Sequence, residues 1–224
     1  LLTESKSLGQ VVISAVAAAA HVIILVFSKD LGSAVIFFAG YLIMVFIATK
    51  NYFYLFAGIL GGAGASIVAY HMFSHVRTRV IAFLHPWSNI NDSGYQITQS
   101  LFAIGTGGWF GLGIDQGDPT SIPYVEQDFI FSAVAEEMGV IFGICLILVC
   151  VSCFIVFMKI AMQLKEDFYR YIAVGISTIY IFQVFLTIGG GTRFIPLTGV
   201  TLPLVSYGGS SVLTTIIMFG IIQG

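Results

Sequence analysis

Charged residues are scarce in this 224-residue sequence, and their scarcity excludes a water-exposed globular fold. Asp, Glu, Lys and Arg make up 9% of the chain, whereas 58% of the residues are hydrophobic. Soluble domains contain about 25% charged residues, so too few charges are present to cover a water-facing surface. The net charge is −2 and no basic cluster occurs, which excludes an electrostatic surface for nucleic acid.

Potential disulfide and metal ligands are also few. Cys145, Cys150 and Cys153 all lie in one apolar run, which is typical of small apolar filler residues rather than of a disulfide. His71 and His75 are four residues apart, but no neighbouring acid or cysteine completes a zinc ligand set. The sequence therefore predicts no metal site.

Long uncharged runs dominate the chain, and six of them are long enough to cross a bilayer as helices, which takes about 17–25 residues. They are Val11–Ser28, Ser33–Thr49, Tyr52–Phe73, Met138–Met158 (extended backward to Phe129), Tyr171–Gly189 and Leu204–Ile222. A transmembrane barrel would alternate polar and apolar residues, whereas these runs are uniformly apolar. We predict an all-α polytopic membrane bundle that forms a single transmembrane domain over residues 1–224.

The two ends of the sequence indicate a piece of a longer chain. Lys6 and Ala17–Ala20 give the first run some features of a signal peptide, but five further spans favour a transmembrane helix. The sequence opens on Leu1 without a Met and closes on Gly224, where the last run ends.

Six spans place both ends of the chain on one side. Five Lys and Arg lie on that side and four on the other, so the positive-inside rule predicts residues 159–170 in the cytoplasm and the large loop 74–128 outside it. That loop is too long for an ordinary connection. Its stretch Tyr95–Phe110 has helical spacing of apolar residues and predicts a helix lying in the membrane interface.

Asp128 is the first candidate for chemistry, because it stands where the outer loop meets an apolar run. An Asp at this place can cap a helix N-terminus, and a carboxylate at the outer boundary can also act as a general base on a hydroxyl. The two interpretations are compatible. Glu126, two residues earlier on the same loop, is the other candidate for the general base.

Glu136 and Glu137 lie inside the same apolar stretch, with no basic residue within a turn. Ionisable groups within a membrane are costly and usually face a cavity or a partner. Helical spacing predicts that Glu136 lines a cavity near Asp128 and that Glu137 pairs with another helix. The alternative is that both acids snorkel to the interface.

Three arginines on the outer side could bind a phosphate, because a guanidinium offers a bidentate fork. Arg193 follows Gly189–Gly191, and Arg77 and Arg79 lie early in the outer loop. The alternative is ordinary snorkelling. The small residues of Ser206–Ser211 favour close helix packing at the start of the last span.

The order of these motifs resembles the SEDS family of shape, elongation, division and sporulation proteins. The motifs are Asp30-Leu31-Gly32-Ser33-Ala34, Arg77 with Arg79, Pro86-Trp87, Gly94-Tyr95-Gln96-Ile97, Gly107-Gly108, Gly111-Leu112-Gly113, Asp128-Phe129-Ile130-Phe131, Glu136-Glu137-Met138-Gly139, Pro196-Leu197-Thr198-Gly199 and Pro203–Ser211. The resemblance implies a bundle of about ten spans, of which this chain would hold roughly the last six.

The resemblance also implies an activity. A SEDS protein polymerises lipid II into glycan strands at the outer face of the bacterial cytoplasmic membrane, with a class B penicillin-binding protein as the transpeptidase partner. The family's catalytic aspartate corresponds to Asp128, and we take Arg193, Arg77, Arg79, Glu136 and Glu126 as candidate substrate-binding residues. A divalent cation could assist, although no ligand set for one is evident. Gly139 and Gly143 form a small-residue face on which the partner helix, or a helix of the same chain, could pack.

Several positions depart from the family pattern. Tyr124-Val125 and Gln127 replace the residues usual before the aspartate, and Asp118 stands where the family often has a lysine. Ser28-Lys29 and Thr187 are further departures.

The alternative function is a flippase for a lipid-linked precursor without glycosyl transfer, in which Glu136 and Glu137 would form a relay or gate.

Overall fold

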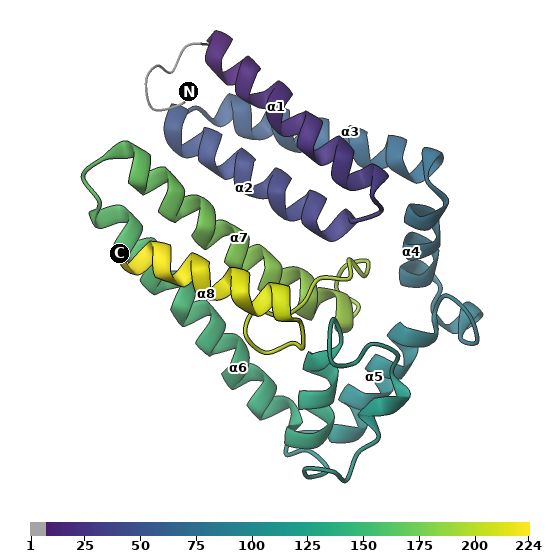
Figure 1. The fold of residues 1–224 in the computed structure, drawn as a ribbon. Coiled ribbons are helices and arrows are strands. Elements are labelled where there is room, and N and C mark those ends of the chain that lie inside the picture. Colours follow the sequence, from purple (N-terminus) through teal and green to yellow (C-terminus); the bar gives the residue numbers. More distant parts are fainter. Residues whose placement is uncertain (1–7) are drawn as a thin grey trace. The chain divides into compact units, whose positions relative to one another are not determined.

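The computed structural model describes residues 8–224, and the regular structure of these residues is entirely helical (Figure 1). The longer helices are α1 (Leu8–Phe27), α2 (Leu31–Thr49), α3 (Tyr52–Met72), α4 (Ser74–Leu84), α5 (Tyr95–Gly107), α6 (Ile130–Gln163), α7 (Asp167–Gly191) and α8 (Gly209–Gln223). Two short 3-10 helices, η1 (Trp87–Asn89) and η2 (Pro119–Ser121), lie in the loop between α4 and α6. The predicted all-α class is confirmed.

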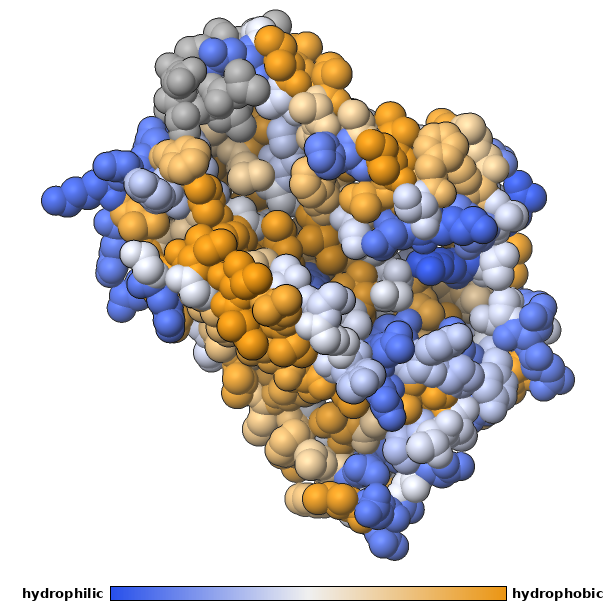
Figure 2. All heavy atoms as spheres, in the orientation of Figure 1, coloured by the Kyte–Doolittle hydropathy of each residue, from blue (hydrophilic) through white to orange (hydrophobic). Residues whose placement is uncertain are grey.

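Among residues 8–224, five helices are long and apolar enough to cross a membrane, namely α1, α2, α3, α6 and α7. The space-filling view shows hydrophobic side chains over much of the visible surface, as expected for helices that face lipid (Figure 2). The sixth predicted span, Leu204–Ile222, needs correction. Its helix, α8, begins only at Gly209, so residues 204–208 of the predicted run are not helical.

The chain forms two compact units, and the first comprises residues 1–72, 153–182 and 216–224. In its described part, α2 packs against both α1 and α3 (Figure 1). A buried cluster of Ala161, Ala173 and Val174 receives Ile43 and Ile47 of α2. Small residues at these positions let the helices approach closely.

The second unit comprises residues 73–152 and 183–215. Its core includes Ala103, Ile122 and Phe129, with Val125 and Leu197 packed against them. Phe129 is fully buried, so the residue before it is held at a fixed place. The helix predicted over Tyr95–Phe110 is confirmed as α5, which ends slightly earlier, at Gly107. Its position in the membrane interface stays a prediction.

Helix α6 is interrupted at Gly139, whose φ of 84° and ψ of 167° are not helical. At the interruption, backbone N–H and C=O groups lose their hydrogen-bond partners within the helix. Backbone groups of residues 108–113 take the place of those partners. The Val140 amide donates to the Gly108 carbonyl at 2.9 Å, and the Glu136 carbonyl accepts from the Leu112 amide at 2.9 Å. These hydrogen bonds join the loop between α5 and α6 to the spanning helix through backbone groups.

Glycine makes these hydrogen bonds possible. A Cβ added at Gly139 would overlap the Trp109 carbonyl oxygen, and one at Gly111 would overlap the Glu137 carbonyl oxygen. The positive φ of Gly139 also lies in a region that is essentially confined to glycine. The glycine run of the sequence therefore lets the two backbones lie in direct contact.

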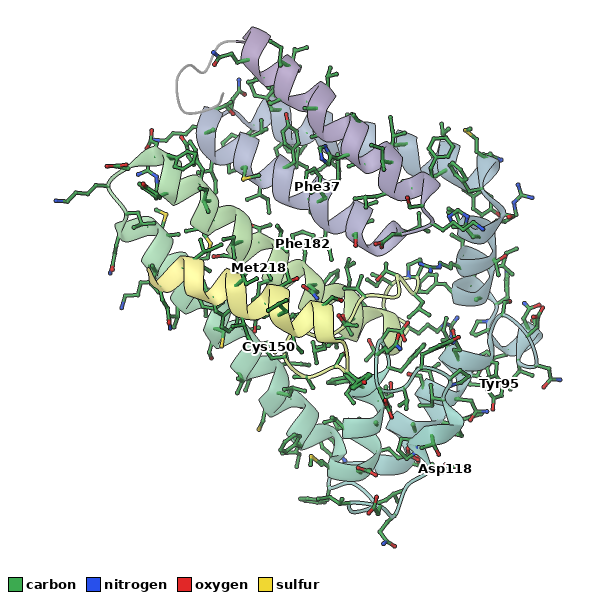
Figure 3. All side chains as sticks on the ribbon, in the orientation of Figure 1. Phe37, Tyr95, Asp118, Cys150, Phe182 and Met218 are labelled. Carbon is green, nitrogen blue, oxygen red and sulfur yellow. The ribbon has the colours of Figure 1, made fainter. Side chains whose placement is uncertain are left out.

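The Gly139–Gly143 face is covered by the chain itself. Gly139 contacts residues 109–111, and a Cβ at Gly143 would lie 3.1 Å from the Phe131 ring. This is the alternative of packing within the protein, so the face gives no support to a partner helix. Cys145, Cys150 and Cys153 do not form disulfides with one another, and Cys150 is buried on α6 (Figure 3).

Candidate active site

Asp128 lies in the second unit, two residues before α6 begins at Ile130. Its neighbour Phe129 is fully buried and fixes the backbone. The Asp128 side chain is half-buried, and its Oδ1 atom is buried without a hydrogen-bond partner among the described residues. Because the helix starts at Ile130, the N-cap position belongs to Phe129. The capping interpretation of Asp128 is therefore the weaker one.

Burial raises the pKa of the Asp128 carboxyl above its usual range. A hydrogen bond with its own backbone and the positive charge of Arg79 oppose this effect without cancelling it. A carboxylate that has lost part of its hydration and lies beside a cation is both a stronger base and still ionisable. These properties suit a residue that removes a proton from a hydroxyl group.

Arg79 comes from α4 and is held beside Asp128 by the loop after α7. Its Nη1 atom donates to the Thr198 carbonyl at 2.9 Å and to the Leu197 carbonyl at 3.4 Å. A Cβ added at Gly199 would lie 3.7 Å from Arg79 Nη2 and 3.9 Å from Asp128 Oδ2. Gly199 thus lies against both the guanidinium and the carboxylate.

Thr198 adds a further polar group at this place. Its Oγ1 atom is buried and, like Asp128 Oδ1, has no hydrogen-bond partner within residues 8–224. Buried polar atoms are normally paired by protein, water or ligand. Asp128 and Thr198 both lie beside Arg79 through other atoms, and a ligand hydroxyl could pair with either unsatisfied oxygen.

The loop that carries Asp128 is fastened from the segment before α8. The Tyr207 amide donates to the Glu126 carbonyl at 2.7 Å, and Ser206 Oγ donates to the Gln127 carbonyl. Ser206 Oγ also accepts from the Leu202 amide at 2.7 Å. The expectation that Ser206–Ser211 begins a packed helix was therefore wrong for Ser206 and Tyr207, because their polar groups are used to hold the Asp128 loop.

Arg193 has a different environment from Arg79. Its Nε donates to the Phe83 carbonyl at 3.0 Å and its Nη2 to the Leu84 carbonyl at 3.4 Å. These carbonyls end α4, where a cation is favourable. Because Arg79 on α4 reaches the 197–198 carbonyls, the two arginines fasten α4 and the loop after α7 in both directions.

The remaining candidates lie at the edges of this site. The Glu126 side chain is exposed, and the contact of this residue with Tyr207 is made by its backbone carbonyl. Arg77 is exposed on α4, and two residues of helix separate its direction from that of Arg79 by about 200°. The structure thus brings Asp128 and Arg79 together, whereas substrate binding by Glu126, Arg77 or Arg193 stays a prediction.

Glu136 and Glu137 contact the loop between α5 and α6. Glu136 is 7% exposed, and its Oε1 accepts from the Asp118 amide at 3.4 Å. Glu137 Oε1 accepts from the Asp115 amide at 3.3 Å, so the expectation that it pairs with another helix was wrong. No described contact joins Glu136 to Asp128. Both acids instead anchor residues 115–118; Asp118 of this segment is labelled in Figure 3.

Sequence reasoning did not single out Thr198 or Gly199 as site residues. Both belong to the Pro196–Gly199 motif that carries part of the family resemblance, and this was the available signal. Their proximity to Asp128 arises from contact between segments that are about 70 residues apart in the sequence. Only the tertiary structure reveals such a contact.

The fold and the site define a polytopic helical membrane protein with a carboxylate–arginine pair just outside a spanning helix. The chain belongs to the cell cycle protein family represented by FtsW, RodA and SpoVE, whose model matches residues 3–224.

Curated relatives agree with this assignment. The chain is 39% identical over 200 residues to the peptidoglycan glycosyltransferase RodA of Mycobacterium tuberculosis (strain ATCC 25618 / H37Rv), covering 89% of this chain and 42% of the relative. It is 39% identical over 210 residues to the probable peptidoglycan glycosyltransferase FtsW of Francisella salina, covering 89% and 51%. It is 32% identical over 203 residues to the stage V sporulation protein E of Bacillus subtilis (strain 168), covering 89% and 55%.

The chain thus spans about half the length of the curated relatives that it matches. A solved structure described as "Structural coordination of polymerization and crosslinking by a peptidoglycan synthase complex" contains a chain with the same fold. The TM-score is 0.81 at 24% identity, and the match covers 99% of this chain and 63% of the other.

Proposed function

We propose that the protein containing this chain is a peptidoglycan glycosyltransferase that polymerises lipid II, with Asp128 as its general base. The observation that carries the proposal is the half-buried Asp128 carboxyl beside Arg79, with buried polar atoms that lack partners. Membership of the family and the names of the relatives support the same activity. The polymerisation assay on Asp128→Asn, given in the Discussion, is its test.

The reaction is an inverting glycosyl transfer. Asp128 takes the proton from the acceptor sugar's 4-hydroxyl, and that oxygen forms a bond to the anomeric carbon of the donor. The bond from this carbon to the pyrophosphate breaks, and undecaprenyl pyrophosphate leaves with the bonding electrons. Arg79 is placed to stabilise negative charge next to Asp128, and Arg193 and Arg77 are further candidates for the pyrophosphate.

We also propose the surroundings in which this reaction takes place. The active loop faces the outside of the bacterial cytoplasmic membrane, where lipid-linked precursor and growing strand meet. A class B penicillin-binding protein would crosslink the strands as the partner. Family membership supports both statements, and the Gly139–Gly143 face is no longer a candidate for the partner's docking site.

Replacing Arg79 with glutamine should move the acid limb of the polymerisation rate to higher pH. The base must be ionised, and the Arg79 charge lowers the Asp128 pKa. Removing that charge lets the pKa rise further, so activity should be lost at a higher pH as the solution is acidified. The pH dependence of kcat for lipid II polymerisation measures this shift.

Arg77→Gln is the matched control, because it removes an equal charge from the exposed side of the same helix. Its acid limb should stay near that of the wild type. An Arg79→Gln profile with an unmoved acid limb, or one moved to lower pH, would contradict the role of Asp128 as a base beside Arg79.

In the flippase alternative, Glu136 and Glu137 form a proton relay. A pair of substitutions at Glu136 distinguishes this role from the anchoring of the loop. Glu136→Gln keeps an oxygen that can accept from the Asp118 amide, whereas Glu136→Leu removes it. We expect the glutamine variant to polymerise within about threefold of the wild type and the leucine variant to lose about tenfold, the equivalent of one hydrogen bond. Lipid II polymerisation by purified protein gives both rates.

A relay needs a group that titrates, so a flippase would be disabled equally by both substitutions. If both variants lose precursor translocation equally in a vesicle assay, transport is favoured, whatever the polymerisation activity of the wild type. Retained activity of Glu136→Gln supports the anchoring contacts seen in the structure.

A further inference from the structure

Residues 109–114 expose large apolar side chains from the loop that enters the α6 interruption. The exposed fractions are 67% for Trp109, 85% for Phe110 and 69% for Ile114. Burying one such side chain is worth about 1.5–3 kcal/mol, so leaving three of them in water within six residues is unfavourable. This segment, called here the aromatic loop, therefore needs an apolar environment.

The sequence of α6 fixes the depth of this loop in a membrane. Glu137 and Lys159 flank 21 uncharged residues, 138–158. At 1.5 Å per residue they span about 31 Å, close to the roughly 30 Å of a bilayer's hydrocarbon core. One edge of that core therefore lies near Glu137 and Gly139.

Hydrogen bonds hold the aromatic loop at this edge. The Ile141 amide donates to the Trp109 carbonyl at 3.3 Å, and the Gly113 amide donates to the Glu137 carbonyl at 2.9 Å. The loop backbone is thus level with residues 137–141 of the spanning helix. Non-helical backbone at membrane depth requires such internal partners, and the contacts with α6 supply them.

The surface beside the loop is that of a lipid-facing helix. Ile141 and Phe142 of α6 are exposed next to the interruption, and Figure 2 shows hydrophobic residues over much of the visible surface. Polar, exposed Asp115 and Gln116 follow the loop directly. Trp at the edge of an apolar band with acids outside it is the arrangement of a membrane interface.

We propose that the aromatic loop inserts Trp109, Phe110 and Ile114 into the outer edge of the lipid bilayer. The inserted side chains and the Glu136–Glu137 anchors would together fix the height of residues 112–118 above the membrane. The occupant is the acyl-chain region of the bilayer, because the loop continues the exposed apolar surface of a spanning helix. The proposal does not depend on glycosyl transfer.

The test is a depth measurement on the full-length protein in nanodiscs of phosphatidylethanolamine and phosphatidylglycerol. Every native cysteine is replaced, and a nitroxide is attached to Phe110→Cys or, independently, to Ile114→Cys. Leu148→Cys on the exposed face of α6 is the lipid control, and Asn91→Cys in the exposed outer loop is the aqueous control. Power-saturation EPR then compares collisions with oxygen and with a water-soluble nickel chelate.

We expect both loop labels to favour oxygen over the nickel chelate by several-fold relative to Asn91→Cys, at a depth shallower than Leu148→Cys. Nickel collisions equal to those at Asn91→Cys would place the loop in water and overturn the proposal. Protection from both reagents would show that protein covers the loop, which would overturn it as well.

Discussion

Replacing Asp128 with asparagine should lower the rate of lipid II polymerisation by about 10²–10⁴-fold, the usual contribution of a general base. Asparagine has nearly the same shape but cannot accept the proton. The fold should survive, because Asp128 Oδ1 has no hydrogen-bond partner among the described residues that the change would remove. Initial rates with labelled lipid II and purified full-length protein give the comparison.

Glu126→Gln is the matched control, since Glu126 lies two residues away on the same loop and its side chain is exposed. Its effect should be much smaller. Expression and membrane insertion of both variants should equal those of the wild type. If Asp128→Asn keeps most of the wild-type rate, Asp128 is not the base, and the chemistry must be sought at Glu126 or Glu136.

Replacing Gly139 with alanine should prevent most of the protein from folding. The φ of 84° and ψ of 167° lie in a region where other residues are strained by about 1–3 kcal/mol. The added Cβ would also overlap the Trp109 carbonyl oxygen, and backbone that is hydrogen-bonded on both sides cannot move away. Detergent-solubilised yield and thermal stability, followed by fluorescence-detected size exclusion, measure the loss.

Gly105→Ala is the control for this experiment. Gly105 is exposed on α5, and a Cβ there would have no atom within 4 Å. Alanine favours a helix by about 1 kcal/mol over glycine, so this variant should be as stable as the wild type or slightly more stable. Equal stability of the two alanine variants would show that α6 does not need its interruption.

Local features of the sequence predicted much of the fold. Uncharged runs such as Ser33–Thr49 and Tyr52–Phe73 predicted α2 and α3 closely, because length and apolarity alone decide whether a helix suits a membrane. The predicted start of the last helix, at Leu204, was wrong. The apolar residues of the last run continue those of α8, but Ser206 and Tyr207 bond the Asp128 loop and leave the helix no earlier start than Gly209.

The interruption of α6 also escaped prediction. Glycine occurs in many transmembrane helices without breaking them, so Gly139 alone carried no signal. The break exists because residues 108–113 supply backbone partners on both sides of it. The same contact gave Glu137 a loop amide as its partner in place of a helix.

By itself the sequence determined the helical membrane class and the family, with Asp128 as its candidate base, because apolar length and motif order can be read along the chain without knowing which residues contact one another. Only the tertiary structure decided which groups surround Asp128. Arg79 and Thr198 are separated by more than 100 residues along the chain and meet through a hydrogen bond of 2.9 Å. Such a pairing depends on how α4 and the loop after α7 pack against one another, which no local pattern specifies.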